Sequence, residues 1–194
     1  MMDAPLTVHT LGRFTVLLHG RPLTSLSSRT AEALLIYLMR QTRPLSRQVL
    51  ADFLWDERAT DRAAANLRTL LTMMRKELGE YLIIDRYSVG FNHANDFWLD
   101  VAVLERQMTM LTPIIQAATP LTVAQAAALQ TAVDLYQGPF LDGFYLSESR
   151  GFDEWLSLTQ EQLRHQVEMG LRRLVTHFLE TDSMRWVARM PPGC

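Results

Sequence analysis

Asn66-Leu-Arg-Thr-Leu-Leu-Thr-Met-Met-Arg-Lys-Glu-Leu-Gly79 is the stretch of sequence that decides the fold. Its apolar residues return at intervals of three and four, which is the period of an amphipathic helix with one buried face. The repeat predicts a helix from about Asp61 to Leu78. We expect the helix to stop at Gly79, because a residue without a Cβ adopts a left-handed cap at little cost. The predicted buried stripe comprises Leu67, Leu70, Leu71, Met74 and Leu78.

The opposite face of this helix is basic and rich in hydrogen-bonding groups. At about 100° per residue, the side chains that point away from the stripe are Arg62, Ala65, Thr69, Thr72 and Lys76, flanked by Asn66, Arg68, Met73 and Arg75. Glu77 is the one acid near the end of this face. A solvated surface helix usually mixes Glu with Lys, so the composition favours a helix that contacts an anionic partner.

Short strands and two helices are predicted before this segment. The expected β elements are runs at 6–11 and 14–19, a turn at 19–22 and a short strand at Leu23. Ser27 or Ser28 is expected to cap a first helix, which Pro44 ends because the residue before a proline disfavours the α region. Ser46 is expected to cap a second, short helix that ends near Trp55.

Two further β runs follow the basic helix and predict a hairpin. They are Tyr81–Ile84 and Val89–Phe91, with Arg86 and Tyr87 at the tip between them. Strands, three helices and a hairpin in this order are the plan of a winged helix-turn-helix domain. Its third helix enters the major groove of duplex DNA, and its hairpin wing reaches the adjacent backbone or minor groove. Arg47, near the start of the second helix, is a candidate phosphate contact or an ordinary surface charge.

Several stretches of the chain resemble the SARP/AfsR-like bacterial transcriptional activators. They are Leu11–Val16, Gly20–Pro22, Ser28–Leu38, Leu45–Trp55 and Asn66–Gly79. The resemblance implies an OmpR/PhoB-type winged helix that binds DNA. Ala64 and Met73 depart from the family pattern, which often has arginine at these two positions. No receiver domain precedes the winged helix, so phosphorelay control is not expected.

The second half of the sequence is expected to be helical. A first helix is expected to start near Trp98, with Asp100 as its N-cap. After a break bracketed by Pro113 and Pro120, a second helix is expected from Thr122 to Tyr136. One or two further helices are expected from Ser149 to about Glu180. The last region has a predicted core stripe of Trp155, Leu158, Leu163, Val167, Leu171, Leu174 and Phe178.

Two motifs of this half resemble the bacterial transcriptional activator domain of the same family, Leu135–Phe144 and Phe152–Leu156. The expected fold is therefore an α+β winged helix-turn-helix domain at 1–97, followed by an all-α domain of TPR-like helix pairs at 98–194. In the family this domain continues through further helix pairs. The chain is accordingly expected to be truncated, as the N-terminal part of a larger regulator.

Composition narrows the classes of function. Residues 1–99 carry twelve basic and ten acidic side chains, whereas residues 100–194 carry seven basic and eleven acidic ones. No apolar run approaches the roughly 18–20 residues of a membrane span, and the lone cysteine, Cys194, forms no internal disulfide, so a cytoplasmic protein is expected. The histidines lack metal-ligand spacing, and the carboxylates Glu148, Asp153 and Glu154 lack a histidine partner. We expect no metal, no cofactor and no enzymatic activity.

The sequence thus predicts a sequence-specific duplex-DNA-binding transcriptional regulator, which the family resemblance makes an activator. Base edges are assigned to Arg62, Asn66, Thr69, Thr72, Met73 and Lys76, and phosphates chiefly to Arg68 and Arg75. The resemblance also implies that the helical half either forms a homodimer on repeated sites or contacts RNA polymerase. An alternative of a different class is a winged-helix protein-interaction scaffold that does not bind DNA.

Overall fold

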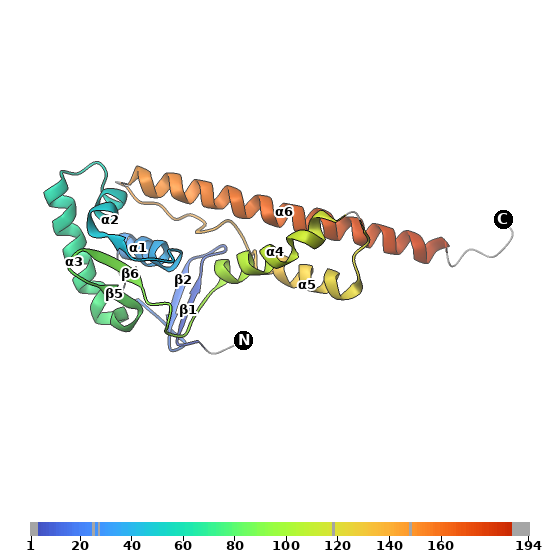
Figure 1. Cartoon of the computed structure of the whole chain (residues 1–194), viewed down its shortest axis with the longest axis horizontal. Coiled ribbons are helices and arrows are strands. Elements are labelled where there is room, and N and C mark those ends of the chain that lie inside the picture. Colours follow the sequence, from blue (N-terminus) through green and yellow to red (C-terminus); the bar gives the residue numbers. More distant parts are fainter. Residues whose placement is uncertain (1–3, 25, 27, 118, 148, 188–194) are drawn as a thin grey trace.

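Two small sheets and three helices form the N-terminal half of the protein (Figure 1). The computed structural model describes residues 4–24, 26, 28–117, 119–147 and 149–187, with the backbone alone over 182–187. The strands are β1 (Leu6–His9), β2 (Thr15–Leu18), β3 (Arg21–Pro22), β4 (Leu45–Ser46), β5 (Leu82–Ile84), β6 (Ser88–Phe91) and β7 (Phe97–Leu99). One sheet has the order β3-β2-β1-β7 and the other β4-β6-β5. The third helix and the β5–β6 hairpin therefore follow one another, as in a winged helix.

The helices of this half are α1 (Arg29–Met39), α2 (Arg47–Leu54) and α3 (Thr60–Leu78), followed by the short 3-10 turn η1 (Gly79–Tyr81). The central helix α1 buries most of its residues, so it is surrounded by the other elements. Ser46 caps α2 as expected, since its side chain accepts a hydrogen bond from the Val49 N–H. The Ser27 alternative for the first cap lies outside the described residues, and Ser28 occupies the N-cap position of α1.

Three helices form the C-terminal half, which we call the helical half: α4 (Asp100–Gln116), α5 (Val123–Val133) and α6 (Arg150–Val187). Helix α6 begins beside α2 and runs along the length of the molecule past α4 and α5 (Figure 1). A mixed α/β region followed by packed helices is the fold class that the sequence predicts, and this prediction is confirmed.

The two halves share one apolar core and are joined by backbone pairing. Strand β7 pairs in parallel with β1, in the register Trp98 to Thr7, and delivers the chain directly into α4. Asp100, at the start of α4, is buried, and its carboxylate accepts hydrogen bonds from the Thr10 and Leu11 N–H groups and from the Thr10 hydroxyl. The start of the helical half is therefore fixed to the end of β1.

A second junction joins α6 to the end of α2. The Ser149 hydroxyl donates to the Phe53 carbonyl at 2.6 Å and accepts from the Phe152 N–H at 3.1 Å, so it caps α6 while holding α2. The Asp56 carboxylate accepts from the Arg150 N–H at 3.2 Å. The Phe53 ring stacks on Tyr37 at 4.0 Å between ring centroids and meets Phe152 edge to face. These contacts place the first turn of α6 against the turn between α2 and α3.

Several local expectations are wrong. Helix α3 ends at Leu78 with Gly79 as its C-cap, as expected, but Gly79 is not left-handed. Its φ is −58°, and the chain continues into η1, because Tyr81 is buried and the chain turns tightly to place it. Trp98 lies in β7 rather than in a helix, since pairing with β1 outweighs the local pattern. Asp100 is the first residue of α4 instead of its N-cap. The expected strand at Leu23 is instead the two-residue strand β3.

The helical half also differs from expectation at two places. Helix α4 continues through Pro113 to Gln116, since Ile114 and Ile115 pack against the core and hold its last turn. Three members of the predicted α6 stripe are exposed, Leu158 (65%), Leu171 (44%) and Phe178 (52%). Leu158 and Leu171 lie off the buried face of α6, which in these turns is formed by Leu156, Thr159, Gly170 and Leu174. Phe178 lies toward the C-terminal end of α6, which extends past α5 (Figure 1). Glu148 and Cys194 lie outside the described residues.

Candidate nucleic-acid interface

Helix α3 presents one face to the core and the other to solvent. All five residues of the predicted stripe are buried, together with Ala63. Toward solvent, the exposed candidates are Arg62, Arg68, Thr69, Thr72, Arg75 and Lys76. Asn66 and Met73 are half-buried at the edges of this surface, and Met73 packs against the core. The periodicity therefore places the candidate contact residues on one accessible face, with Met73 turned partly away from it.

The centre of this face is a shallow hollow of about 400 Å³, lined by Arg68, Thr69, Thr72, Met73 and Lys76. The Thr69 and Thr72 hydroxyls donate to the carbonyls of Ala65 and Arg68, at 3.2 and 2.9 Å. Their donor is thus used within the helix, and each hydroxyl oxygen keeps acceptor capacity toward a ligand. The hollow therefore combines two hydrogen-bond acceptors with two cations.

The β5–β6 hairpin is shaped by Asp85, a residue that the sequence interpretation did not single out. Its carboxylate accepts from the Tyr87 and Ser88 N–H groups and from the Ser88 hydroxyl, each at 2.7 Å. The Ser88 hydroxyl and then the two backbone donors lower the pKa of Asp85 below its usual value. An Asp that bonds back to the backbone two and three residues later is a turn signature, so the sequence did contain this signal.

Arg86 and Tyr87 project from this turn. The Arg86 guanidinium lies over the Tyr87 ring at 5.3 Å from its centroid, a cation–π contact that holds both side chains together. Tyr87 is 72% exposed. The tip therefore presents a cation and a hydroxyl-bearing ring to solvent.

Arg47 lies beside this tip, because β4 pairs with β6 and α2 begins immediately after β4. The Arg47 N–H donates to the Tyr87 carbonyl at 2.9 Å, and the Arg47 charge contributes to the lowered pKa of Asp85. The Arg47 side chain is half-buried, and its Nε has no hydrogen-bond partner among the described residues. The structure thus joins Arg47 to Arg86 and Tyr87, which the sequence places 39 and 40 positions away.

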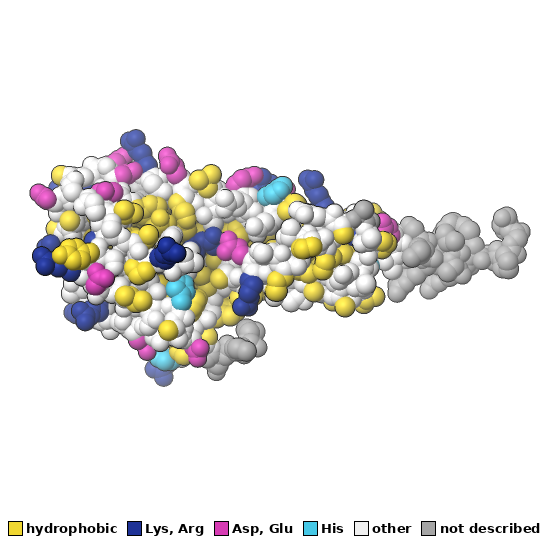
Figure 2. Space-filling model, in the orientation of Figure 1, with side chains coloured by type: hydrophobic (Ala, Val, Ile, Leu, Met, Phe, Trp, Pro, Cys, Tyr) yellow, Lys and Arg dark blue, Asp and Glu magenta, His cyan; other side chains and the backbone are white. Residues whose placement is uncertain are grey.

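The cations of α3 and of the hairpin tip are not neutralised by acids among the described residues. Within the part of the chain that the structure describes, no ion pair involves Arg62, Arg68, Arg75, Lys76 or Arg86. Figure 2 shows Lys and Arg side chains, with some acidic ones among them, at the end of the molecule that α3 forms. This face keeps its positive charges available to an anionic partner.

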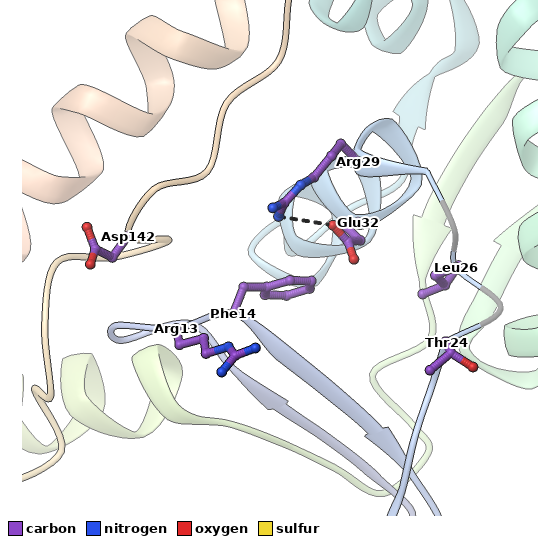
Figure 3. Close-up of a pocket in the computed structure, with 7 residues that line it drawn as sticks. All are labelled: Arg13, Phe14, Thr24, Leu26, Arg29, Glu32 and Asp142. Carbon is purple, nitrogen blue, oxygen red and sulfur yellow. Dashed lines mark hydrogen bonds and ion pairs between the residues drawn. The ribbon is translucent and has the colours of Figure 1, made fainter.

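A second hollow, of about 500 Å³, opens beside the start of α1 and does not have the organisation of a ligand site (Figure 3). Arg29 is paired with Glu32 at 3.5 Å and also lies over the Phe144 ring. Burial raises the pKa of Glu32, and Arg29 opposes this rise. Asp142 points away from the other residues of the hollow. Its polar groups therefore do not converge on a common point.

The described residues contain no group of three or more His, Cys, Asp and Glu side chains able to hold a metal ion. Among the helices described, none is long and apolar enough to cross a membrane.

Comparison with known proteins gives a similar solved structure. No protein-family model and no curated protein matches the sequence. EmbR from Mycobacterium tuberculosis, solved in complex with a low-affinity phosphopeptide, aligns over 96% of this chain with a TM-score of 0.60 and 20% sequence identity. The chain shares its fold with EmbR. It spans about half of the EmbR chain, 51% of its length, and at this identity the likeness is one of fold.

Proposed function

We propose that this protein is a SARP-like, sequence-specific duplex-DNA-binding transcriptional regulator that acts as an activator in the cytoplasm. The observation that carries the proposal is the exposed face of α3 on the helix that precedes the wing, whose four cations form no ion pair with the described residues. The EmbR-like fold supports it, since EmbR is a SARP-family regulator. The proposed domains are a winged helix at 1–97 and a TPR-like activator domain at 98–194.

In this proposal α3 lies in a major groove and the wing lies on the adjacent backbone or minor groove. Base edges are read by Arg62, Asn66, Thr69, Thr72, Met73 and Lys76, while Arg68, Arg75, Arg47 and Arg86 chiefly meet phosphates. The hydroxyl oxygens of Thr69 and Thr72 suit the amino donors of adenine and cytosine in the major groove. The half-buried Met73 supplies an apolar contact in place of a cation.

The helical half serves protein contacts in this proposal. Its packing against α2 keeps it clear of the exposed face of α3. It is therefore free to meet a second copy of the regulator on repeated sites, or RNA polymerase, while α3 occupies DNA.

A salt titration of DNA binding tests the proposal. The affinity of the 194-residue chain for random-sequence duplex is measured by fluorescence anisotropy over a range of salt concentrations. Each phosphate contact contributes about 0.9 to the slope of log affinity against log salt, so Arg68→Ala, which removes an exposed cation assigned to a phosphate, is expected to lower the slope by about one. Arg106→Ala, an exposed cation of α4, should leave the slope unchanged.

Two results count against the proposal. An unchanged slope in Arg68→Ala removes this residue from the interface. A wild-type chain with no salt-dependent affinity, even near the ~10⁻⁴–10⁻⁶ M of non-specific binding, is a protein-interaction scaffold instead of a DNA-binding regulator.

A further inference from the structure

The hollow of about 400 Å³ on the exposed face of α3 has a lining of apolar groups between two cations. Along the helix, Thr69, Thr72 and Met73 lie between Arg68 and Lys76. Eight residues separate the two cations, a rise of about 12 Å, or about the height of three to four stacked base pairs. A base edge that enters the hollow therefore meets hydrocarbon first, with a positive charge on either side along the helix.

The two threonines contribute methyl groups to this lining. The Thr69 and Thr72 hydroxyls donate to the carbonyls of Ala65 and Arg68, four residues back, which holds each oxygen against its own helix. The other heavy atom on each Cβ is the Cγ2 methyl, and both residues are exposed. The methyl groups are therefore directed toward the hollow, while the oxygens remain as acceptors at its edge.

Met73 supplies the third apolar group. Its side chain is half-buried and packs against the core, so it is held in place before any ligand arrives. An unbranched thioether adapts to the shape of an apolar ligand. It has no hydrogen-bond donor, so it cannot form the bidentate pair with guanine that an arginine forms. The lining at Met73 therefore favours an apolar group on a base edge over a hydrogen-bond acceptor.

We propose that the hollow binds the 5-methyl group of a thymine in the major groove and so selects an A·T pair at this position. Among the four bases, only thymine carries a methyl group on its major-groove edge. The thymine O4 atom accepts from the Lys76 ammonium, and the N6 amino group of the paired adenine donates to a threonine oxygen. Arg68 meets an adjacent phosphate. The inference rests on the proposed function, since it needs α3 in the major groove.

The other bases match this lining less well. Cytosine has no methyl group, so the hydrocarbon of Met73 and the threonines would stay hydrated beside it. A purine would place its N7 acceptor against this hydrocarbon and lose the hydration of that atom without gaining a donor. The order of groups in the hollow thus matches thymine in preference to cytosine, guanine or adenine.

Replacement of thymine by deoxyuridine tests the inference, because the two differ only in the methyl group. Sites bound by the 194-residue chain are first selected from random duplex DNA. Each thymine of the selected site is then replaced in turn, and Kd is measured by fluorescence anisotropy. At the thymine that faces the hollow, loss of one buried methyl group should raise Kd about fourfold. Deoxyuridine in the duplex outside the site should leave Kd unchanged.

Substitutions in the hollow assign the effect to its lining. Thr72→Ser removes the methyl group and keeps the hydroxyl, and Met73→Ala removes the thioether; each should reduce the preference for thymine over deoxyuridine to below about twofold. Thr72→Val is the matched variant that keeps a methyl group and loses the hydroxyl, so the preference should persist even if binding weakens. Arg86→Ala on the wing should weaken the binding of both duplexes by the same factor. Circular dichroism confirms that each variant keeps its helix content.

The outcomes separate this inference from the proposed function. The inference is overturned if the selected site contains no thymine, if no deoxyuridine weakens binding, or if Thr72→Ser and Met73→Ala keep the full preference. Binding without any sequence preference overturns it as well. In all of these cases the chain still binds duplex DNA, which a scaffold would not do. A wild-type chain that binds no duplex at any salt concentration instead fails the proposed function, and the inference falls with it.

Discussion

Asp100 connects the two halves of the protein, and we predict that Asp100→Ala strongly destabilises it. The buried carboxylate accepts four hydrogen bonds, from the Thr10 N–H and hydroxyl at 2.6 Å each, from the Leu11 N–H at 2.9 Å and from the Val101 N–H at 2.7 Å. The substitution leaves three backbone donors and one hydroxyl without this acceptor. Water does not reach these donors without opening the contact between β1 and α4.

The expected cost follows from these four contacts. Hydrogen bonds to a charged group contribute about 1.5–3 kcal/mol each, and a buried donor left without a partner costs about 1–3 kcal/mol. The four bonds share one carboxylate, so their contributions are not additive. We therefore expect the free energy of unfolding to fall by about 4 kcal/mol. For a chain of this length, each kcal/mol corresponds to about 2–4 °C in Tm, which gives a decrease of about 8–16 °C.

Urea denaturation followed by tryptophan fluorescence and circular dichroism measures this loss. Asp134→Ala is the matched control, because the Asp134 carboxylate is exposed and accepts from the Gln130 amide at 2.6 Å. The control should change the free energy of unfolding by less than about 0.5 kcal/mol. A loss below about 1 kcal/mol in Asp100→Ala would refute the reasoning, since it would mean that the four donors find other acceptors at little cost.

Two further substitutions test the wing and the α2–α6 junction. Ser88→Ala removes the hydroxyl that contributes most to the lowered pKa of Asp85, so an NMR pH titration should show this pKa rising toward its usual value. A depressed carboxyl pKa stabilises the fold above the unfolded pKa, and this stability is lost as pH falls through the folded value, so the variant should lose less stability in acid than the wild type. Identical titration of Asp85 in both proteins contradicts this account. Phe152→Ala removes a fully buried ring and should cost about 3–5 kcal/mol in urea denaturation, whereas Leu158→Ala on the exposed side of α6 should cost far less; equal losses would show that the junction is not a packed core.

Local sequence signals account for the elements that carry the candidate site. Helix α3 was predictable because a three-and-four repeat over 19 residues is long enough to define both a buried and an exposed face. Ser46 was predictable as an N-cap because its side chain bonds within its own helix. The hairpin strands were predictable because β-branched and aromatic residues flank a polar turn. These signals depend on neighbours in the sequence alone.

The errors arise where distant partners decide the structure. Trp98 is in a strand because β1, about 90 residues earlier, offers it a pairing edge. Aspartate is a residue type that commonly caps helices, yet the Asp100 carboxylate accepts hydrogen bonds from the distant Thr10 and Leu11 N–H groups. Arg47 joins the wing only through the pairing of β4 with β6. The α6 repeat marks apolar positions without indicating how far the neighbouring helices extend, so the exposure of Phe178 could not be derived from it.

The contacts between the halves have a consequence for how two copies would read DNA. The chain between β6 and α4 includes β7, which is paired with β1, so no flexible linker separates α3 from the helical half. Asp100 fixes the start of α4, and Ser149 with Phe53 fixes the start of α6 against α2. The helical half is therefore held at a set distance and angle from the exposed face of α3. If two copies bind DNA as proposed, the separation of their α3 helices follows from this rigid fold, and that separation sets the spacing between the two half-sites.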